Sequence, residues 1–349
     1  MTPLVSILIP AYNAEPWIEE TIRSALGQTW PNKDIIVVDD GSTDGTLTVI
    51  RRFESNGIRV VTQANQGAAV ARNVALSLAQ GDYIQWLDAD DVLDLHKIER
   101  QLRKIETGFT ERTLLSGAWG SFIYRPRKAR FIPTLLWHDL SPVEWLVRKM
   151  NSNLHMQTDN WLVSRALTEA AGPWDHRLSH DDDGEYFCRV ILASDGIQFV
   201  PEAKSYYRDT GSQSVSYIGG CDKKLESFFL SMKLHIQYLR SVEDSERTRL
   251  ACLTHLHTWF PIFYPNRPDL MRKTQQLAAS LGSQLSLPQA TWKYAWIEKL
   301  FGFAAAKHTQ SYYNRTKSSA LRAWDKTMYF LERKLQVAQP RKRARSFPG

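Results

Sequence analysis

The chain has 349 residues, of which 43% are hydrophobic and 23% charged, with a formal net charge of +7. This is the composition of a globular protein, and the length predicts about two domains. Three widely spaced cysteines without C-x-x-C spacing argue against a disulfide framework or a zinc site, so a reducing, cytoplasmic location is expected. No apolar run approaches the roughly 18 residues of a membrane span, and no signal peptide precedes the strand-like sequence at Leu4.

The N-terminal part of the chain alternates short apolar runs with amphipathic segments. Four runs rich in β-branched residues have the length of buried strands, and the segments between them place apolar residues at helical spacing. The expected strands are 4–9 (where Pro10 ends the run), 35–38, 58–63 and 82–93, and the expected helices are 15–30, 46–55 and 68–81. This alternation predicts an α/β fold with a Rossmann-like, mostly parallel sheet flanked by helices.

The rest of the chain divides near residue 219. Before that point, the pattern predicts helices at 96–107, 141–150 and 179–194, a strand at 113–125, a strand-to-helix segment at 159–175 and a pair of strands at 197–210. After it, strand signals stop, and the segments are helical, aromatic-rich and basic. We therefore expect an α/β domain over 1–218, a helical C-terminal region over 219–338 and a basic, disordered tail over 339–349.

The stretch "IQWLDADDV" joins an apolar run to three carboxylates, those of Asp88, Asp90 and Asp91. Carboxylates at the end of a buried strand are partly desolvated and repel one another. A solvated turn tolerates such a cluster, but a divalent cation also removes the conflict. Magnesium and manganese are typically held by one or two carboxylates together with substrate phosphates. Because ligands of parallel sheets bind beyond the carboxyl ends of the strands, the cluster indicates a metal-dependent site for a diphosphate-bearing substrate.

Several common catalytic motifs are missing from the sequence. It contains no G-x-G-x-x-G fingerprint, no P-loop and no G-x-S-x-G nucleophile elbow. The stretch "DDGSTDGT" looks like a calcium loop, but the EF-hand pattern fails at Ser42 and Arg51. These absences argue against a dinucleotide-binding enzyme, a P-loop NTPase and a hydrolase of the nucleophile-elbow type.

Four sequence blocks together resemble the family 2 glycosyltransferases, which have the GT-A fold and invert the anomeric carbon. The blocks are "VSILIPAYNAEPWIEETIRSALGQTW", "IIVVDDGSTDGT", "NQGAAVARNVALSLAQGDYIQWLDADDVL" and "DDDGEYFCRV", and they occur in the family's order over about residues 4–216. The resemblance implies sugar transfer from a nucleotide-sugar of UDP or dTDP type to a hydroxyl of a saccharide or lipid-linked acceptor, as in polysaccharide or glycan biosynthesis. It also implies Mn²⁺ or Mg²⁺ as cofactor.

The resemblance assigns roles to individual residues on the donor side. It implies that Asp40 accepts a hydrogen bond from the nucleotide base and that Arg72 supports the nucleotide pocket. In the family's DxD motif, Asp88 lies near the ribose and Asp90 binds the metal. Asp91 is the alternative metal ligand, because such short acidic runs align ambiguously by one position. The loop that packs on the base consists of Pro10, Ala11 and Tyr12.

The block "DDDGEYFCRV" implies the general base. Asp182 and Asp183 match the family's Glu-Asp pair, so the base maps to Asp183, and Asp182 replaces the usual Glu. Considered by itself, a carboxylate at the start of an apolar helix can take the proton of an acceptor hydroxyl, although ordinary helix capping also explains the three aspartates. A single base without a carboxylate nucleophile favours inversion. The family's His after "YYR" is missing, because Asp209 and Thr210 follow there.

The acceptor side carries tryptophans and the C-terminal region carries basic helices. Trp161, shortly before the base, is the first candidate for stacking on an acceptor sugar, with a core position as the alternative.

The C-terminal helices fit peripheral binding to the inner face of an anionic membrane, or a helical cap or oligomer interface. No motif for nucleic acid accompanies the basic tail. A GT-A-like binding module without activity and a membrane-surface scaffold remain as alternative readings.

Overall fold

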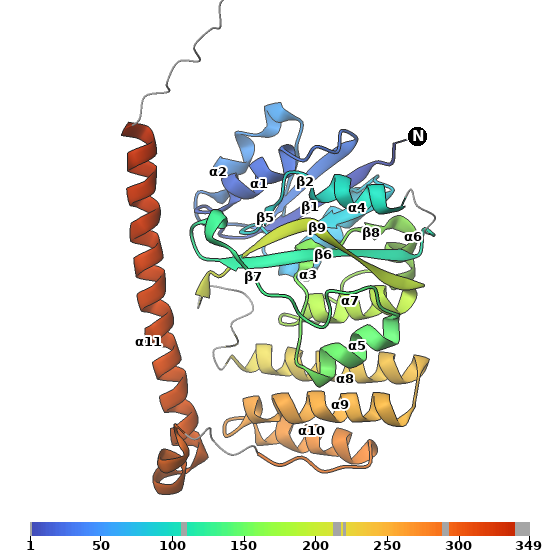
Figure 1. Ribbon diagram of the computed structural model, residues 1–349, viewed down its shortest axis with the longest axis vertical. Helices are drawn as coiled ribbons and strands as arrows, with labels where there is room; N and C mark the ends of the chain where they lie inside the picture. Colours follow the sequence, from blue (N-terminus) through green and yellow to red (C-terminus); the bar gives the residue numbers. More distant parts are fainter. Residues whose placement is uncertain (1, 106–109, 212–217, 219–220, 288–292, 339–349) are drawn as a thin grey trace, which may run out of the picture.

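The computed structural model describes residues 2–105, 110–211, 218, 221–287 and 293–338 (Figure 1). The tail for which we expected disorder lies outside these residues, as does part of the expected boundary near residue 219. Strands occupy the N-terminal two thirds of the described chain, and helices follow, as the sequence pattern predicted.

A five-stranded sheet in the order β3-β2-β1-β4-β8 forms the centre of the N-terminal part. The first four of these strands in the chain run parallel, and β8 pairs antiparallel with β4. The predicted mostly parallel α/β sheet is therefore confirmed. The strands are β1 (Val5–Ala11), β2 (Lys33–Asp39), β3 (Arg59–Thr62), β4 (Tyr83–Trp86) and β8 (Val163–Ser164).

Helices cover both faces of this sheet, so its central strands are buried (Figure 1). Every residue of β1 is buried, which explains its continuous apolar run. We expected Pro10 to end the strand, but β1 continues to Ala11. β4 pairs with β1 only as far as Leu8, so the edge beside Pro10 has no β4 ladder to maintain. The flanking helices are α1 (Ile18–Leu26), α2 (Thr46–Arg51), α3 (Ala68–Leu78) and α6 (Arg165–Ala171).

A second, four-stranded sheet has the order β5-β9-β6-β7. We expected a pair of strands over 197–210, but this segment is the single strand β9. Its pairing with β6 shifts register between Gly117 and Ala118, so the residues around Pro201 form a bulge and not a turn. Gly117 allows the carbonyl of Ala203 to approach, because a Cβ at that position would overlap it. The strands are β5 (Val92–Leu93), β6 (Thr113–Phe122), β7 (Arg130–Phe131) and β9 (Gly196–Arg208).

The C-terminal helices pack directly against the α/β part. One cluster of buried apolar side chains includes Trp86 of β4, Tyr186 of α7, Phe228 of α8 and Leu256 of α9. Whether the helical region is a separate domain stays a prediction. The helices of this half are α4 (Lys97–Ile105), α5 (Pro142–Asn151), α7 (Asp182–Ala193), α8 (Asp222–Val242), α9 (Glu246–Trp259) and α10 (Pro268–Ser280).

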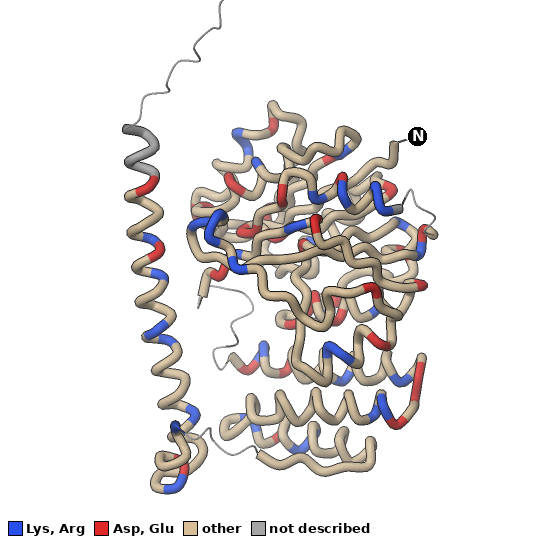
Figure 2. The backbone as a smooth tube through the Cα atoms, viewed as in Figure 1, with Lys and Arg blue, Asp and Glu red and all other residues tan. Residues whose placement is uncertain are grey.

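The last helix, α11 (Ala295–Ala338), lies along one side of the molecule (Figure 1). Its helical geometry breaks at Gly302, where φ is 82°. Ion pairs hold it to the α/β part: Arg125 contacts Asp325 at 2.6 Å and Glu332 at 2.9 Å. Between Glu298 and Asp325, the charged residues along this helix are lysines and arginines, and acidic residues follow only at Asp325 and Glu332 (Figure 2). Among the described residues, no helix combines the length and apolar character needed to cross a membrane.

Candidate active site

The loops after β1 and β2 are joined by hydrogen bonds and form a single platform at the carboxyl edge of the sheet. The backbone N–H of Asn13 donates to the Ser42 hydroxyl at 3.0 Å, and the Asn13 side-chain oxygen accepts from the backbone N–H of Thr43 at 2.8 Å. Tyr12 extends from this platform with 49% of its surface exposed. An exposed aromatic ring on a fixed loop is suited to stacking against a flat ligand.

Asp40 fastens the loop that leads into α3. Its carboxylate is buried and accepts three hydrogen bonds, from the side chain of Gln63 and from the backbone N–H groups of Gln66 and Gly67, at 2.7 to 2.9 Å. The neighbouring Asp39 is also buried, and its Oδ1 has no protein partner within the described ranges. Only Asp40 was predicted to contact a ligand, although the "DD" pair contains both carboxylates. A contact from Asp40 to a nucleotide base stays a prediction.

The acidic turn after β4 separates its three carboxylates into different environments. The Asp88 side chain is 32% exposed, Asp90 is half-buried and Asp91 is buried. Burial, together with the charge of Asp88, raises the pKa of Asp90 to about 6. Burial and the nearby charges of Asp159 and Asp90 raise the pKa of Asp91 well above its usual value. The mutual repulsion expected from the sequence is therefore present.

Asp91 also has a structural role that the sequence did not reveal. Its carboxylate accepts the backbone N–H of Arg208 at 2.7 Å, which ties the acidic turn to the end of β9. The buried Arg208 guanidinium donates to the main-chain oxygen of Asp90 at 2.7 Å and pairs with Glu20. It also lies 4.4 Å from the ring centre of Trp17. Arg208 directly precedes Asp209 and Thr210, the positions where this sequence lacks the family's His.

Arg72 connects the acidic turn to the start of α7. Its guanidinium is buried and pairs with Asp88 at 2.8 Å and with Asp182 at 2.6 Å. It also lies 4.4 Å from the ring centre of Trp174. Burial raises the pKa of Asp182 to about 6, although the charge of Arg72 opposes this shift. Arg72 thus joins two acidic segments that are far apart in the sequence, and its predicted support of a nucleotide pocket stays a prediction.

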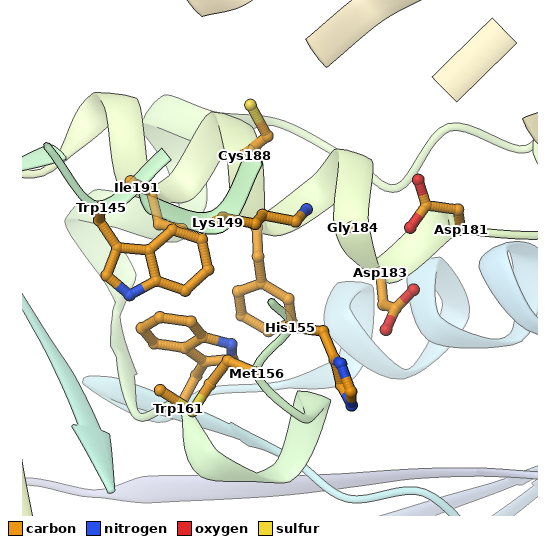
Figure 3. Close-up of a pocket in the computed structure, with 11 residues that line it drawn as sticks. Trp145, Lys149, His155, Met156, Trp161, Asp181, Asp183, Gly184, Cys188 and Ile191 are labelled. Atoms are coloured by element: carbon orange, nitrogen blue, oxygen red, sulfur yellow. The ribbon is translucent and has the colours of Figure 1, made fainter. Parts of the chain in front are cut away.

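Asp183 lies at one end of a cavity between α5 and α7 (Figure 3). The lining includes His155 and Lys149, and Figure 3 shows the His155 ring beside the Asp183 carboxylate. Burial lowers the pKa of His155, although the Asp183 carboxylate opposes that shift. The rings of His155 and Trp119 are 5.1 Å apart. His155 was not predicted from the sequence, because a single His in a loop without a motif carries no signal.

Trp161 lines the same cavity as Asp183, but it belongs to the buried core (Figure 3). Its surface exposure is 0%, and its ring stacks on Phe187 with 5.4 Å between the ring centres. Phe187 of α7 covers Trp161, which agrees with the core position weighed as the alternative, and stacking of Trp161 on an acceptor sugar stays a prediction. Trp119 is half-buried and contacts His155, which lines the cavity with Asp183.

The carboxylates at the strand ends could bind a divalent cation, but they would not supply all of its ligands. Within the described ranges, no group of three or more His, Cys, Asp or Glu side chains is assembled to hold a metal ion. The half-buried carboxylate of Asp90 and the partly exposed carboxylate of Asp88 suit a hard cation that keeps phosphate or water ligands. The residues therefore fit Mg²⁺ or Mn²⁺ bound together with a diphosphate.

Comparison with known proteins identifies the part of the chain that contains the strand-end site. The model of the family described as "Glycosyl transferase family 2" matches residues 6–166. These residues form a family 2 glycosyltransferase domain. Asp182 and Asp183 lie beyond the matched residues of this domain.

Similar proteins agree with this assignment. A 107-residue stretch is 45% identical to the UDP-Glc:alpha-D-GlcNAc-diphosphoundecaprenol beta-1,3-glucosyltransferase WfaP of Escherichia coli, covering 30% of this chain and 42% of WfaP. The chain thus spans less than half of that relative. S. aureus TarS 1–349 solved with UDP-GlcNAc has a TM-score of 0.63 at 16% identity, covering 89% of this chain and 92% of TarS 1–349.

A mannosyltransferase of Pyrobaculum calidifontis solved with GDP-Man and Mn²⁺ has a TM-score of 0.53 at 17% identity, covering 93% of this chain and 88% of the other. At such low identities these two structures establish the shared fold alone. The fold of the family 2 glycosyltransferase domain therefore agrees with the GT-A expectation from the sequence.

Proposed function

We propose that this family 2 protein is an inverting, metal-dependent glycosyltransferase that moves a sugar from a UDP- or dTDP-type donor to an acceptor hydroxyl. One observation carries the proposal. Arg72 bonds both Asp88, at the end of a donor-side strand, and Asp182, the neighbour of Asp183. Through this contact, carboxylates suited to a metal and a carboxylate suited to general-base catalysis belong to one site.

The donor side supplies binding and charge control. Pro10 and Ala11, which we expected in a loop, are the last residues of β1 and lead directly to Tyr12, whose exposed ring would pack on the base. Asp40 keeps the loop before α3 in position. Asp90, with Asp88 beside it, would hold the metal; Asp91 is disfavoured because it is buried and already accepts the Arg208 N–H. A bound Mn²⁺ or Mg²⁺ would stabilise the negative charge that develops on the leaving diphosphate.

The acceptor side supplies the base. Asp183 would take the proton of the acceptor hydroxyl as that oxygen attacks the anomeric carbon and the bond to the diphosphate breaks. One displacement on the face opposite to the leaving group inverts the anomeric configuration. His155 and Trp119 are the candidates for contact with the acceptor. WfaP is named for a GlcNAc-diphosphoundecaprenol acceptor, which supports a lipid-linked or saccharide acceptor in glycan biosynthesis for this chain.

The test compares the wild type with Asp183→Asn in assays of sugar transfer and of donor hydrolysis with manganese. We expect kcat to fall by about 10³-fold, which is within the range for loss of a general base, while UDP binding persists. Asp195→Asn is the matched control, because Asp195 is a surface carboxylate paired with Arg112. If wild type and variant bind UDP but are equally inactive against a broad donor panel, the protein is a binding module and the proposal is wrong.

We further propose that the C-terminal helix brings the enzyme to the inner face of an anionic membrane. Aromatic side chains on α11 are exposed among basic residues, with Trp324 at 65% and Tyr312 at 72%. Such a surface favours the headgroup region of anionic lipid. Cosedimentation with phosphatidylglycerol vesicles should fall in a Trp324→Ala/Tyr312→Ala variant and not in Ile132→Ala, an exposed control on the α/β part. The membrane proposal would be contradicted if the wild type did not bind vesicles but formed a dimer that the double variant could not form.

A further inference from the structure

We propose that four polar side chains on one face of α8 position Asp183, an inference that rests on the proposed function. The side chains are those of Ser227, Ser231, His235 and Tyr238, at spacings of four, four and three residues. Such spacings place side chains on a single helical face. That face contacts residues 179–185, the segment that contains Asp183.

Ser227 fixes the chain as it enters this segment. Its hydroxyl oxygen accepts the backbone N–H groups of Ser179 and His180, each at 2.9 Å, and its hydroxyl hydrogen is donated to the carbonyl oxygen of His180 at 2.8 Å. The Ser227 side chain is buried. One hydroxyl therefore satisfies three backbone groups that no strand or helix would otherwise bond.

Ser231 and His235 hold the turn on both sides of Asp183. Asp181 adopts the left-handed conformation, with φ at 56°, and its carboxylate accepts the Ser231 hydroxyl. His235 Nε2 donates to the carbonyl oxygen of Gly184 at 2.7 Å. Gly184 is needed because a Cβ there would overlap the Asp181 carboxylate. A left-handed non-glycine residue is strained, so surrounding contacts must maintain it.

His235 acts as a fixed donor and not as a proton carrier. Burial lowers its pKa to about 3, so the ring is neutral near neutral pH. A carbonyl oxygen only accepts, so the proton of the neutral ring is on Nε2. Farther along the helix, the Tyr238 hydroxyl donates to Glu185 at 2.9 Å, and Glu185 also pairs with Arg189 at 2.8 Å.

The polar character of this face supports a positioning role. A helix that only had to cover α7 would present apolar side chains, because burying hydroxyl and imidazole groups has a desolvation cost unless each is bonded. Here Ser231 and His235 are at most 1% exposed, and both are bonded to the segment that carries Asp183. Both bonds are made to this one turn, and neither is made to a donor-side strand end.

The test measures His235→Leu and His235→Gln in the full-length chain. Leucine fills a similar volume but cannot donate to Gly184, whereas the Gln side-chain amide offers an N–H near the position of Nε2. We expect His235→Leu to lower kcat by about 10- to 100-fold, as for a small misplacement of a reacting group, and His235→Gln to retain most of the rate. UDP affinity should stay within about twofold for both, because the change acts on kcat.

Thr274→Val controls for general loss of stability. Thr274 is a buried residue of α10 whose hydroxyl donates to the carbonyl oxygen of Leu270 in its own helix. If kcat falls equally in Thr274→Val and His235→Leu, or if UDP affinity falls together with kcat, the positioning role is wrong.

Hydrogen exchange separates this inference from the proposed function. Amide exchange in 179–185 should be faster in His235→Leu than in the wild type and His235→Gln, while 35–41 at the donor side is unchanged. That result supports positioning even if no donor is turned over. Unchanged exchange in 179–185 overturns it, whether or not the protein transfers sugar.

Discussion

Two acidic segments meet at this site, and they are held in place in different ways. The turn with Asp88 and Asp90 follows a buried parallel strand, so the backbone ladder of the sheet determines where it begins. The turn with Asp181 and Asp183 starts a helix with a strained residue, and side chains of α8 hold it. Arg72 joins the two segments.

This difference indicates which substitutions should disturb donor binding and which should disturb the position of the proposed base. A strand end is fixed by many backbone hydrogen bonds, which survive single substitutions. A helix start held by a few buried side-chain bonds responds to the loss of one of them. Donor binding should therefore be robust to changes in the helical region, and the position of the base should not.

The largest expected effect comes from removing the link between the two segments. Arg72→Met leaves Asp182 buried without its partner, so we expect the free energy of unfolding to drop by about 3 kcal/mol at pH 7.5, as for breaking a buried ion pair. The loss should shrink toward pH 5. The pKa of Asp182 is already raised to about 6 by burial, and protonation removes the uncompensated charge. Urea unfolding at both pH values measures this, and Arg72→Met/Asp182→Asn should recover part of the loss.

The next effect distinguishes two neighbouring carboxylates of the strand-end turn. Asp90→Asn removes the proposed metal ligand and should lower kcat by about 100-fold or more, since a metal contributes several kcal/mol of charge stabilisation. Asp91→Asn keeps an acceptor for the Arg208 N–H and removes a buried, repelling charge. It should therefore retain near wild-type activity. Manganese titration of activity for both variants checks this, and the reverse order of effects would assign the metal to Asp91.

The smallest effect tests the buried helical side. Burial, with the neighbouring His235, lowers the pKa of His255 on α9 to about 3. In the unfolded chain this His binds a proton with a pKa near 6.5, whereas in the folded chain it stays neutral down to about pH 3. The free energy of unfolding therefore falls as the pH decreases from 6.5 toward 3. From pH 7 to 5, the wild type should lose about 2 kcal/mol more than His255→Gln. Carboxyl groups with a raised pKa have the opposite effect on stability, but they are present in both proteins, so the difference between wild type and variant reports on His255 alone. Equal pH dependence of the free energy of unfolding in the two proteins would show that His255 binds its proton in the folded state.

Much of the donor side was predictable from the sequence because it depends on local patterns. Continuous β-branched runs predict buried parallel strands, and the carboxyl ends of such strands share one edge. From those two rules, Tyr12, Asp40 and Asp88 are expected at the same edge of the sheet. Two predictions were wrong, namely that the first strand ends before Pro10 and that residues 197–210 form a pair of strands, because edge pairing and a bulge depend on partner strands.

The acceptor side was less predictable because its contacts join residues that are distant in the chain. Trp161 matched the expectation of a sugar-stacking residue by its position in the sequence, but packing against Phe187 buries it. His155 has no motif around it and becomes a candidate only because the fold brings it beside Asp183.

The sequence by itself therefore determined the order of elements, the parallel sheet and the strand-end carboxylates, because periodicity and β-branching act over a few neighbouring residues. Tertiary structure alone decided that Arg72 bridges Asp88 and Asp182, that Asp91 is tied to β9, and that α8 bonds the turn carrying Asp183. These decisions depend on burial and on directional hydrogen bonds between segments 16 to 117 residues apart. Such distant partners cannot be predicted from a pattern of neighbouring residues.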